Sequence, residues 1–275
     1  MRRTFIALAA GALALVGALQ ANGQTPGGWR DVDPENTLVI DTNKGRIIAE
    51  LTPKVAPKSV ERIKTLTRQG FYDGRTFFRV IDDFMAQTGD PEDTGRGGSA
   101  LPDLAGEFSF RRGAELPFAT VQSARGATGF IGALPVLSQP AAQMAITADG
   151  KVKAEGLFCK GILGMARAGD PDSANSQFYL MREKAESLNG KYAVFGRVLS
   201  GLEVVRSIKT GEPVPAPQDT MTKVRILADI PAGERPTIKV QDTNSAEFAA
   251  YVAQQRTAKG ARFDICDLDI VATVQ

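Results

Sequence analysis

Apolar residues recur along the chain in short runs that are separated by turn signals. The first two runs, 38–40 and 47–51, flank Asn43-Lys44-Gly45, and this arrangement predicts a β-hairpin. Further strand-like runs lie at 76–81, 84–87, 161–166, 176–181, 192–198 and 222–230. Many short strands with few helices are typical of a barrel or a sandwich.

Two segments between these runs have helical spacing instead. Apolar residues recur every three residues between Pro57 and Gly70, which predicts an amphipathic helix that begins at the proline and ends at the glycine. Residues 201–208 predict a second, short helix with its apolar residues on one face.

Both ends of the chain have their own patterns. Residues 24–36 are rich in Gly, Pro and Asp, which is typical of a flexible lead-in. Near the other end, Asn244 with Glu247 three residues later predicts a capped helix that continues to about Lys259. Residues 263–274 then predict one more strand.

The N-terminus has the organisation of a secretory signal peptide, predicted over residues 1–23. A basic start, Met1-Arg2-Arg3, precedes an apolar run over 5–19 and then small residues. This run is shorter than the roughly 20 residues of a membrane-spanning helix, so we expect an exported chain without a membrane anchor. A Gram-negative periplasm is its simplest destination. The Arg2-Arg3 pair leaves twin-arginine export open beside the ordinary Sec route.

The composition of the chain excludes several classes of function. The 275 residues, 43% of them hydrophobic, suffice for one sizeable core with additions. The net charge is +2 with both signs spread along the chain, so we expect no nucleic-acid partner. The chain has no histidine, which excludes Ser-His-Asp and Cys-His hydrolases, His-dependent metal sites and His bases. We therefore expect no metal and no cofactor. Carboxylate chemistry, lysine chemistry or catalysis without proton transfer remains.

The chain has two cysteines, Cys159 and Cys266. Export would place them in an oxidising compartment, where a disulfide between them would close a long loop and stabilise the fold by a few kcal/mol. The other interpretation is a pair of buried free thiols.

Three ordered motifs are the most specific feature of the sequence. Residues 77–90 are FFRVIDDFMAQTGD, residues 161–168 are GILGMARA, followed by NSQFYL at 175–180, and residues 190–198 are GKYAVFGRV. Together they resemble the cyclophilin-type peptidyl-prolyl cis/trans isomerases.

This resemblance covers residues 37–230, interrupted by an insertion over about 110–159. It implies a mainly β fold, a closed eight-stranded antiparallel β-barrel with two capping helices. Residues 231–275 would form a C-terminal α/β extension. The insertion has no counterpart in the resemblance: we weigh an extended loop over the substrate groove, a partner-binding surface and a tolerated surface insertion.

The resemblance also implies the site. Arg79 occupies the position of the catalytic arginine, and Gln87 that of the glutamine which supports it. The implied substrate-binding residues are Phe84, Met85, Ala166, Arg167, Tyr179, Leu188 and Tyr192. An X-Pro bond exchanges slowly because amide resonance imposes a barrier of about 20 kcal/mol, and a hydrogen-bond donor that favours the twisted amide lowers it. No base is needed, so the lack of histidine is no obstacle.

Several residues depart from the family pattern. Phe78 precedes the arginine where His is frequent, Thr88 replaces a glycine, and Arg167 replaces an asparagine. Tyr192 stands where many members have a pocket histidine, and Ser187 stands where cyclosporin-sensitive members have tryptophan. We therefore expect altered substrate contacts and weak or no cyclosporin binding.

The predicted function is isomerisation of X-Pro bonds in proline-containing polypeptides, namely exported proteins that are folding. The alternative is a non-catalytic periplasmic chaperone or assembly factor that binds extended, proline-containing chains. A hydrolase is disfavoured because no histidine is present to activate a serine, threonine or cysteine.

Overall fold

The computed structural model describes residues 28–123 and 126–275. The predicted signal peptide, residues 1–23, lies outside the described residues. Within the described part, no helix is both long enough and apolar enough to cross a membrane.

The largest element is an eight-stranded antiparallel sheet. Its strands are β2 (Thr37–Thr42), β3 (Gly45–Leu51), β4 (Phe77–Ile81), β5 (Met85–Thr88), β11 (Ile162–Met165), β12 (Phe178–Met181), β13 (Val194–Ser200) and β14 (Met221–Ile226). They lie in the order β14-β2-β3-β13-β11-β12-β5-β4. The predicted hairpin is confirmed, because β2 and β3 pair from Thr37 opposite Glu50 to Thr42 opposite Gly45.

The two edge strands of this sheet meet only at one end. Strands β4 and β14 share no continuous ladder, but an isolated bridge joins Thr76 to Thr220. Beside it, the N–H of Met221 donates to the Arg75 carbonyl at 2.8 Å and the N–H of Phe77 donates to the Asp219 carbonyl at 2.9 Å. The eight strands therefore form a curled sheet with a short contact between its edges, and the expected closure into a barrel is not confirmed.

Both predicted barrel helices are present, α1 (Pro57–Arg68) and α2 (Leu202–Ser207). The apolar face of α1 is buried against the inner side of the sheet. The carboxylate of Glu107 accepts the backbone N–H groups of Lys58 and Ser59 at 2.9 and 2.8 Å, so it satisfies donors that a helix N-terminus leaves unpaired.

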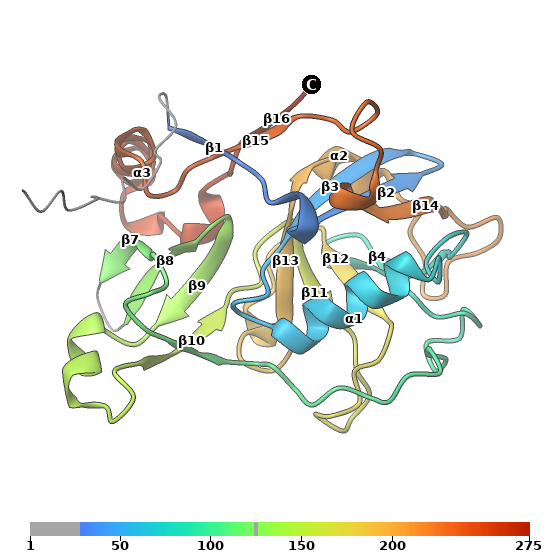
Figure 1. The fold of residues 1–275 in the computed structure, drawn as a ribbon, viewed down its shortest axis with the longest axis horizontal. Helices are drawn as coiled ribbons and strands as arrows, with labels where there is room; N and C mark the ends of the chain where they lie inside the picture. The colour runs from blue at the N-terminus through green and yellow to red at the C-terminus, as the bar shows by residue number, and fades with distance from the viewer. Residues whose placement is uncertain (1–27, 124–125) are drawn as a thin grey trace, which may run out of the picture.

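The insertion forms a second antiparallel sheet, which the sequence analysis did not predict. Its strands are β6 (Phe110–Arg112), β7 (Ala119–Ser123), β8 (Ala127–Ile131), β9 (Leu134–Ser138) and β10 (Val152–Gly156), in the order β6-β10-β9-β8-β7. The extended-loop interpretation is therefore wrong. The sheet lies beside the barrel together with the C-terminal helix (Figure 1).

The C-terminal extension forms a third, small sheet and a helix. Its elements are β15 (Ile238–Gln241), β16 (Ala272–Val274) and α3 (Ala246–Lys259), and β1 (Trp29–Asp31) pairs with β15. The described part of the lead-in, 28–36, is thus largely ordered structure and not the flexible segment that we expected.

Two expectations for the extension are wrong in detail. The cap of α3 is Ser245 and not Asn244, because the Ser245 hydroxyl accepts the N–H of Phe248 at 3.1 Å. The strand predicted over 263–274 is only three residues long. The preceding residues form a 3-10 turn, Ile265–Asp267, which Asp264 caps through its side chain. These local side-chain hydrogen bonds compete with strand pairing.

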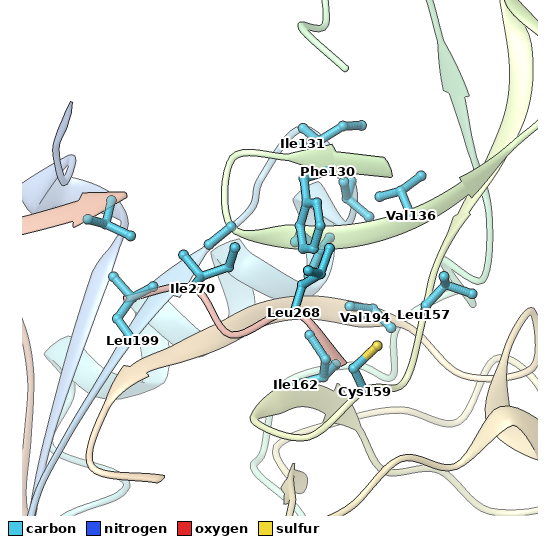
Figure 2. Close-up of a cluster of buried hydrophobic side chains, with 14 of the residues drawn as sticks. Phe130, Ile131, Val136, Leu157, Cys159, Ile162, Val194, Leu199, Leu268 and Ile270 are labelled. Carbon is cyan, nitrogen blue, oxygen red and sulfur yellow. The ribbon is translucent and has the colours of Figure 1, made fainter. Parts of the chain in front are cut away.

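The barrel, the insertion and the extension share one hydrophobic core. Figure 2 shows Phe130 of the insertion, Val194 of the barrel and Leu268 of the extension in the same cluster. Buried Arg197 on β13 donates to the carbonyls of Ala133 and Leu268, each at 3.1 Å. A disulfide joins Cys159 to Cys266 in this region. The additions are therefore packed onto the barrel as one body.

Candidate active site

The structure brings every predicted catalytic and substrate-binding residue into one cavity of about 190 Å³. Its lining consists of Arg79, Phe84, Met85, Gln87, Ala166, Arg167, Tyr179, Leu188 and Tyr192. This volume is below the roughly 300–1,000 Å³ of pockets for drug-sized ligands, so the cavity suits a single small ring. No residue of the insertion sheet lines it.

Arg79 and Gln87 lie directly opposite each other on paired strands. Strand β4 has an irregularity between Phe77 and Arg79, after which Arg79 pairs with Gln87 of β5. Phe78 points into the protein and is buried, whereas the Arg79 side chain is 35% exposed at the cavity rim. The terminal nitrogen Nη1 of Arg79 donates to Oε1 of Gln87 at 3.3 Å.

A second acceptor, Glu212, contacts the guanidinium from a different part of the chain. Nε of Arg79 donates to Oε1 of Glu212 at 2.6 Å. In the part of the chain that the structure describes, no protein acceptor contacts Nη2 of Arg79. Two of the three guanidinium nitrogens thus have protein acceptors, and Nη2 keeps its N–H donors for a ligand in the cavity.

Gln87 is itself fixed by a chain of hydrogen bonds. Its Nε2 donates to Oε1 of Gln177 at 2.8 Å, and Nε2 of Gln177 donates to the Gly97 carbonyl at 2.7 Å. The loop that carries Gly97 is organised by buried Asp90, whose carboxylate accepts four backbone N–H groups. Burial acts to raise the pKa of Asp90, but these hydrogen bonds hold it below its ordinary value.

Aromatic side chains form one wall of the cavity. Tyr179 is buried, its ring stacks on Phe158 with centroids 5.9 Å apart, and Tyr192 meets it edge-on at 6.3 Å. Burial raises the pKa of the Tyr179 hydroxyl well above its ordinary value, so this group stays neutral at physiological pH. Tyr179 therefore lines the cavity as a neutral aromatic side chain.

Arg167 places a second cation beside the cavity. Its guanidinium lies 4.4 Å from the ring centroid of Tyr192 and 5.3 Å from that of Phe108, and it donates to the Lys191 carbonyl at 3.0 Å. The neighbouring Ala166 lines the cavity and donates its backbone N–H to the Gln177 carbonyl at 2.9 Å.

Two residues of this arrangement were missing from the sequence prediction. Gln177 lies inside one of the three motifs, so its position in that motif was a usable signal. Glu212 had no such signal, because 133 positions separate it from Arg79 and only the fold brings them together.

The side chains that line the cavity include no carboxylate and no histidine. Within 28–123 and 126–275, no group of three His, Cys, Asp or Glu residues could hold a metal ion. The group that these residues offer for chemistry is the guanidinium of Arg79, a fixed and permanently charged hydrogen-bond donor beside an apolar cavity.

Comparison with known proteins connects this geometry with a family. Residues 37–228 match the family model described as cyclophilin type peptidyl-prolyl cis-trans isomerase/CLD. A probable peptidyl-prolyl cis-trans isomerase of Brucella suis is 34% identical over 220 residues, which cover 76% of this chain and 86% of that protein. The human peptidyl-prolyl cis-trans isomerase-like 1 is 31% identical over 208 residues, which cover 76% and 97% of the two chains.

A solved structure agrees over more of the chain. The crystal structure of cyclophilin AquaCyp293 from Hirschia baltica has a TM-score of 0.82 and 33% sequence identity, and covers 90% of this chain and 93% of that one. The similarity therefore extends beyond residues 37–228 into the C-terminal extension.

Proposed function

Because the chain belongs to the cyclophilin-type peptidyl-prolyl cis-trans isomerases, we propose that Arg79 and its apolar cavity accelerate rotation about X-Pro bonds without proton transfer or a covalent intermediate. The observation that supports this most is the Arg79 fork, which has two side-chain acceptors, Gln87 and Glu212, while other N–H donors stay free at the cavity.

The proposed mechanism follows from the nature of the barrier. Amide resonance keeps the X-Pro bond planar and imposes a barrier of about 20 kcal/mol, and this resonance is lost in the twisted transition state. A proline ring held between Phe84, Met85 and Tyr179 would lie beside the guanidinium. Hydrogen bonds from Arg79 to the carbonyl oxygen and the pyramidal nitrogen would then be stronger in the transition state than in either ground state.

The apolar walls increase this effect. The aromatic side chains exclude water from the inner part of the cavity, so the interaction of Arg79 with a substrate bound there would be screened less than in bulk solvent. Removal of one preorganised donor of this kind lowers turnover about 10²- to 10³-fold.

The test of the mechanism is the isomerisation rate of an X-Pro tetrapeptide with the wild type and Arg79→Ala at equal folded concentration. We expect kcat/KM to fall by about two to three orders of magnitude in the variant. Equal activity would remove Arg79 from the mechanism. The Arg111→Ala variant, which removes an exposed positive charge of the insertion, serves as a control for the loss of charge alone.

We also propose that the substrates are exported, proline-containing proteins that fold outside the cytoplasm, with the periplasm as the site of action. The basic and apolar pattern of residues 1–23 supports export, and the disulfide between Cys159 and Cys266 is compatible with an oxidising compartment. Cell fractionation with a C-terminal epitope tag tests this. Full-length chain retained in the cytoplasm would contradict it.

A further inference from the structure

Glu212 is the side chain nearest to Arg79 that the family resemblance did not assign. Its Oε1 accepts Nε–H of Arg79 at 2.6 Å, a shorter contact than the 3.3 Å between Arg79 and Gln87. Glu212 does not line the cavity. It therefore contacts the guanidinium without being part of the cavity lining.

The backbone around Glu212 is attached to the strand of Arg79. Gly211 and Val80 exchange two backbone hydrogen bonds of 2.8 Å, and the N–H of Val214 donates to the Phe78 carbonyl at 2.8 Å. These bonds lie on either side of Arg79 along β4. A side chain at Gly211 would meet the backbone of Val214 at 2.6 Å, so the tight approach requires glycine.

The rest of the loop is tied down as well. The carboxylate of Asp219 accepts the N–H of Lys209 at 2.8 Å and the side-chain amide of Asn43 at 2.7 Å. The Lys209 ammonium donates to the Pro215 carbonyl at 2.8 Å. The loop thus holds the Glu212 backbone in a fixed place relative to Arg79.

The ion pair between Arg79 and Glu212 contributes little to the stability of the fold. The two side chains are 35% and 57% exposed, and ion pairs with such exposure add at most a small stabilisation. Its geometric effect is larger. Gln87 alone would leave the guanidinium free to rotate about its long side chain, whereas acceptors at Nε and Nη1 together fix the plane and direction of the fork.

We propose that Glu212 is a positioning residue for the isomerase reaction: its carboxylate orients the Arg79 guanidinium so that the free N–H donors face the X-Pro amide. This inference rests on the proposed role of Arg79. Because Glu212 lies outside the cavity, its effect belongs to the catalytic step and not to substrate binding.

The experiment compares Glu212→Ala, Glu212→Gln and the wild type with an X-Pro peptide. We expect kcat to fall roughly 3- to 10-fold in Glu212→Ala while KM changes less than about twofold. Glu212→Gln keeps an acceptor oxygen and should recover at least half of the loss. Glu115→Gln is the matched control, because Glu115 is also 57% exposed and also pairs with one cation, Lys151, in the insertion.

A spectroscopic measurement is independent of turnover. In nitrogen-15 spectra, the Nε–H resonance of Arg79 should be visible in the wild type and in Glu212→Gln, and should broaden or shift in Glu212→Ala. In the Arg79→Ala background, Glu212→Ala should have no further effect on the rate.

The outcomes separate the two proposals. Unchanged or increased kcat in Glu212→Ala, or a change in KM alone, would overturn the role of Glu212. If Arg79→Ala were as active as the wild type, the proposed catalytic mechanism would be wrong. An unaltered Arg79 Nε–H resonance in Glu212→Ala would separately refute the proposal that Glu212 orients the guanidinium.

Discussion

The disulfide between Cys159 and Cys266 gives the most quantitative prediction of stability. The bond joins the end of the insertion, next to strand β11, to the C-terminal extension and spans 107 positions of the sequence. In the chain-entropy model, a cross-link that closes a loop of this length restricts the unfolded chain and adds about 4–5 kcal/mol to the free energy of unfolding at 25 °C. For a chain of this size, that corresponds to a midpoint temperature higher by about 8–20 °C.

The assay is denaturant unfolding of the oxidised wild type and of the Cys159→Ser/Cys266→Ser variant. We expect the variant to lose about 4–5 kcal/mol, with deprotection in hydrogen exchange concentrated at residues 260–275. A reducing agent should shift the wild type toward the variant and leave the variant unchanged. A difference below about 1 kcal/mol would refute the argument from loop closure.

Three further predictions concern the site and its surroundings. The pKa of Asp90 is lower in the folded state than its unfolded value of about 3.9, so its contribution is present above that pH and is lost as the pH falls through the folded pKa. Asp90→Asn should thus lower the free energy of unfolding by about 1–3 kcal/mol at pH 7. Urea titrations of both proteins should show this difference shrinking below pH ~4, and a difference that stays constant with pH would contradict the role of the Asp90 carboxylate. A methyl group at Gly164 would lie 2.6 Å from the Tyr179 ring, so Gly164→Ala should displace this ring and reduce kcat/KM roughly 10-fold. Unchanged kinetic constants in this variant would show that the position of the Tyr179 ring does not matter for the reaction. Ser187 offers neither an indole donor nor a stacking surface, so cyclosporin should bind weakly while activity is retained, and a submicromolar inhibition constant would exclude this.

The barrel and its cavity could be predicted from the sequence because both depend on local patterns. The alternation around Asn43-Lys44-Gly45 specifies a hairpin, and the three motifs keep Arg79, Gln87 and Tyr179 in fixed positions along neighbouring strands. Within one sheet, strand pairing converts these positions into spatial proximity.

The additions and Glu212 could not be predicted in the same way. Gly129 and Pro135 lie within strands of the insertion, and Gly132 lies in the turn between them. Such residues favour turns in a sequence pattern, yet pairing and burial against the extension make these segments a sheet. Glu212 reaches Arg79 through a loop that is positioned by long-range backbone hydrogen bonds, and no local pattern encodes such contacts.

The most direct test of catalysis by Arg79 is exchange spectroscopy on a proline-containing peptide, with the wild type and Arg79→Ala each at substoichiometric concentration. Cis/trans exchange cross-peaks with the wild type, and binding shifts without exchange with Arg79→Ala, are the predicted result. Binding shifts without accelerated exchange for both proteins would contradict the mechanism and favour a chaperone that holds proline-containing chains without isomerising them.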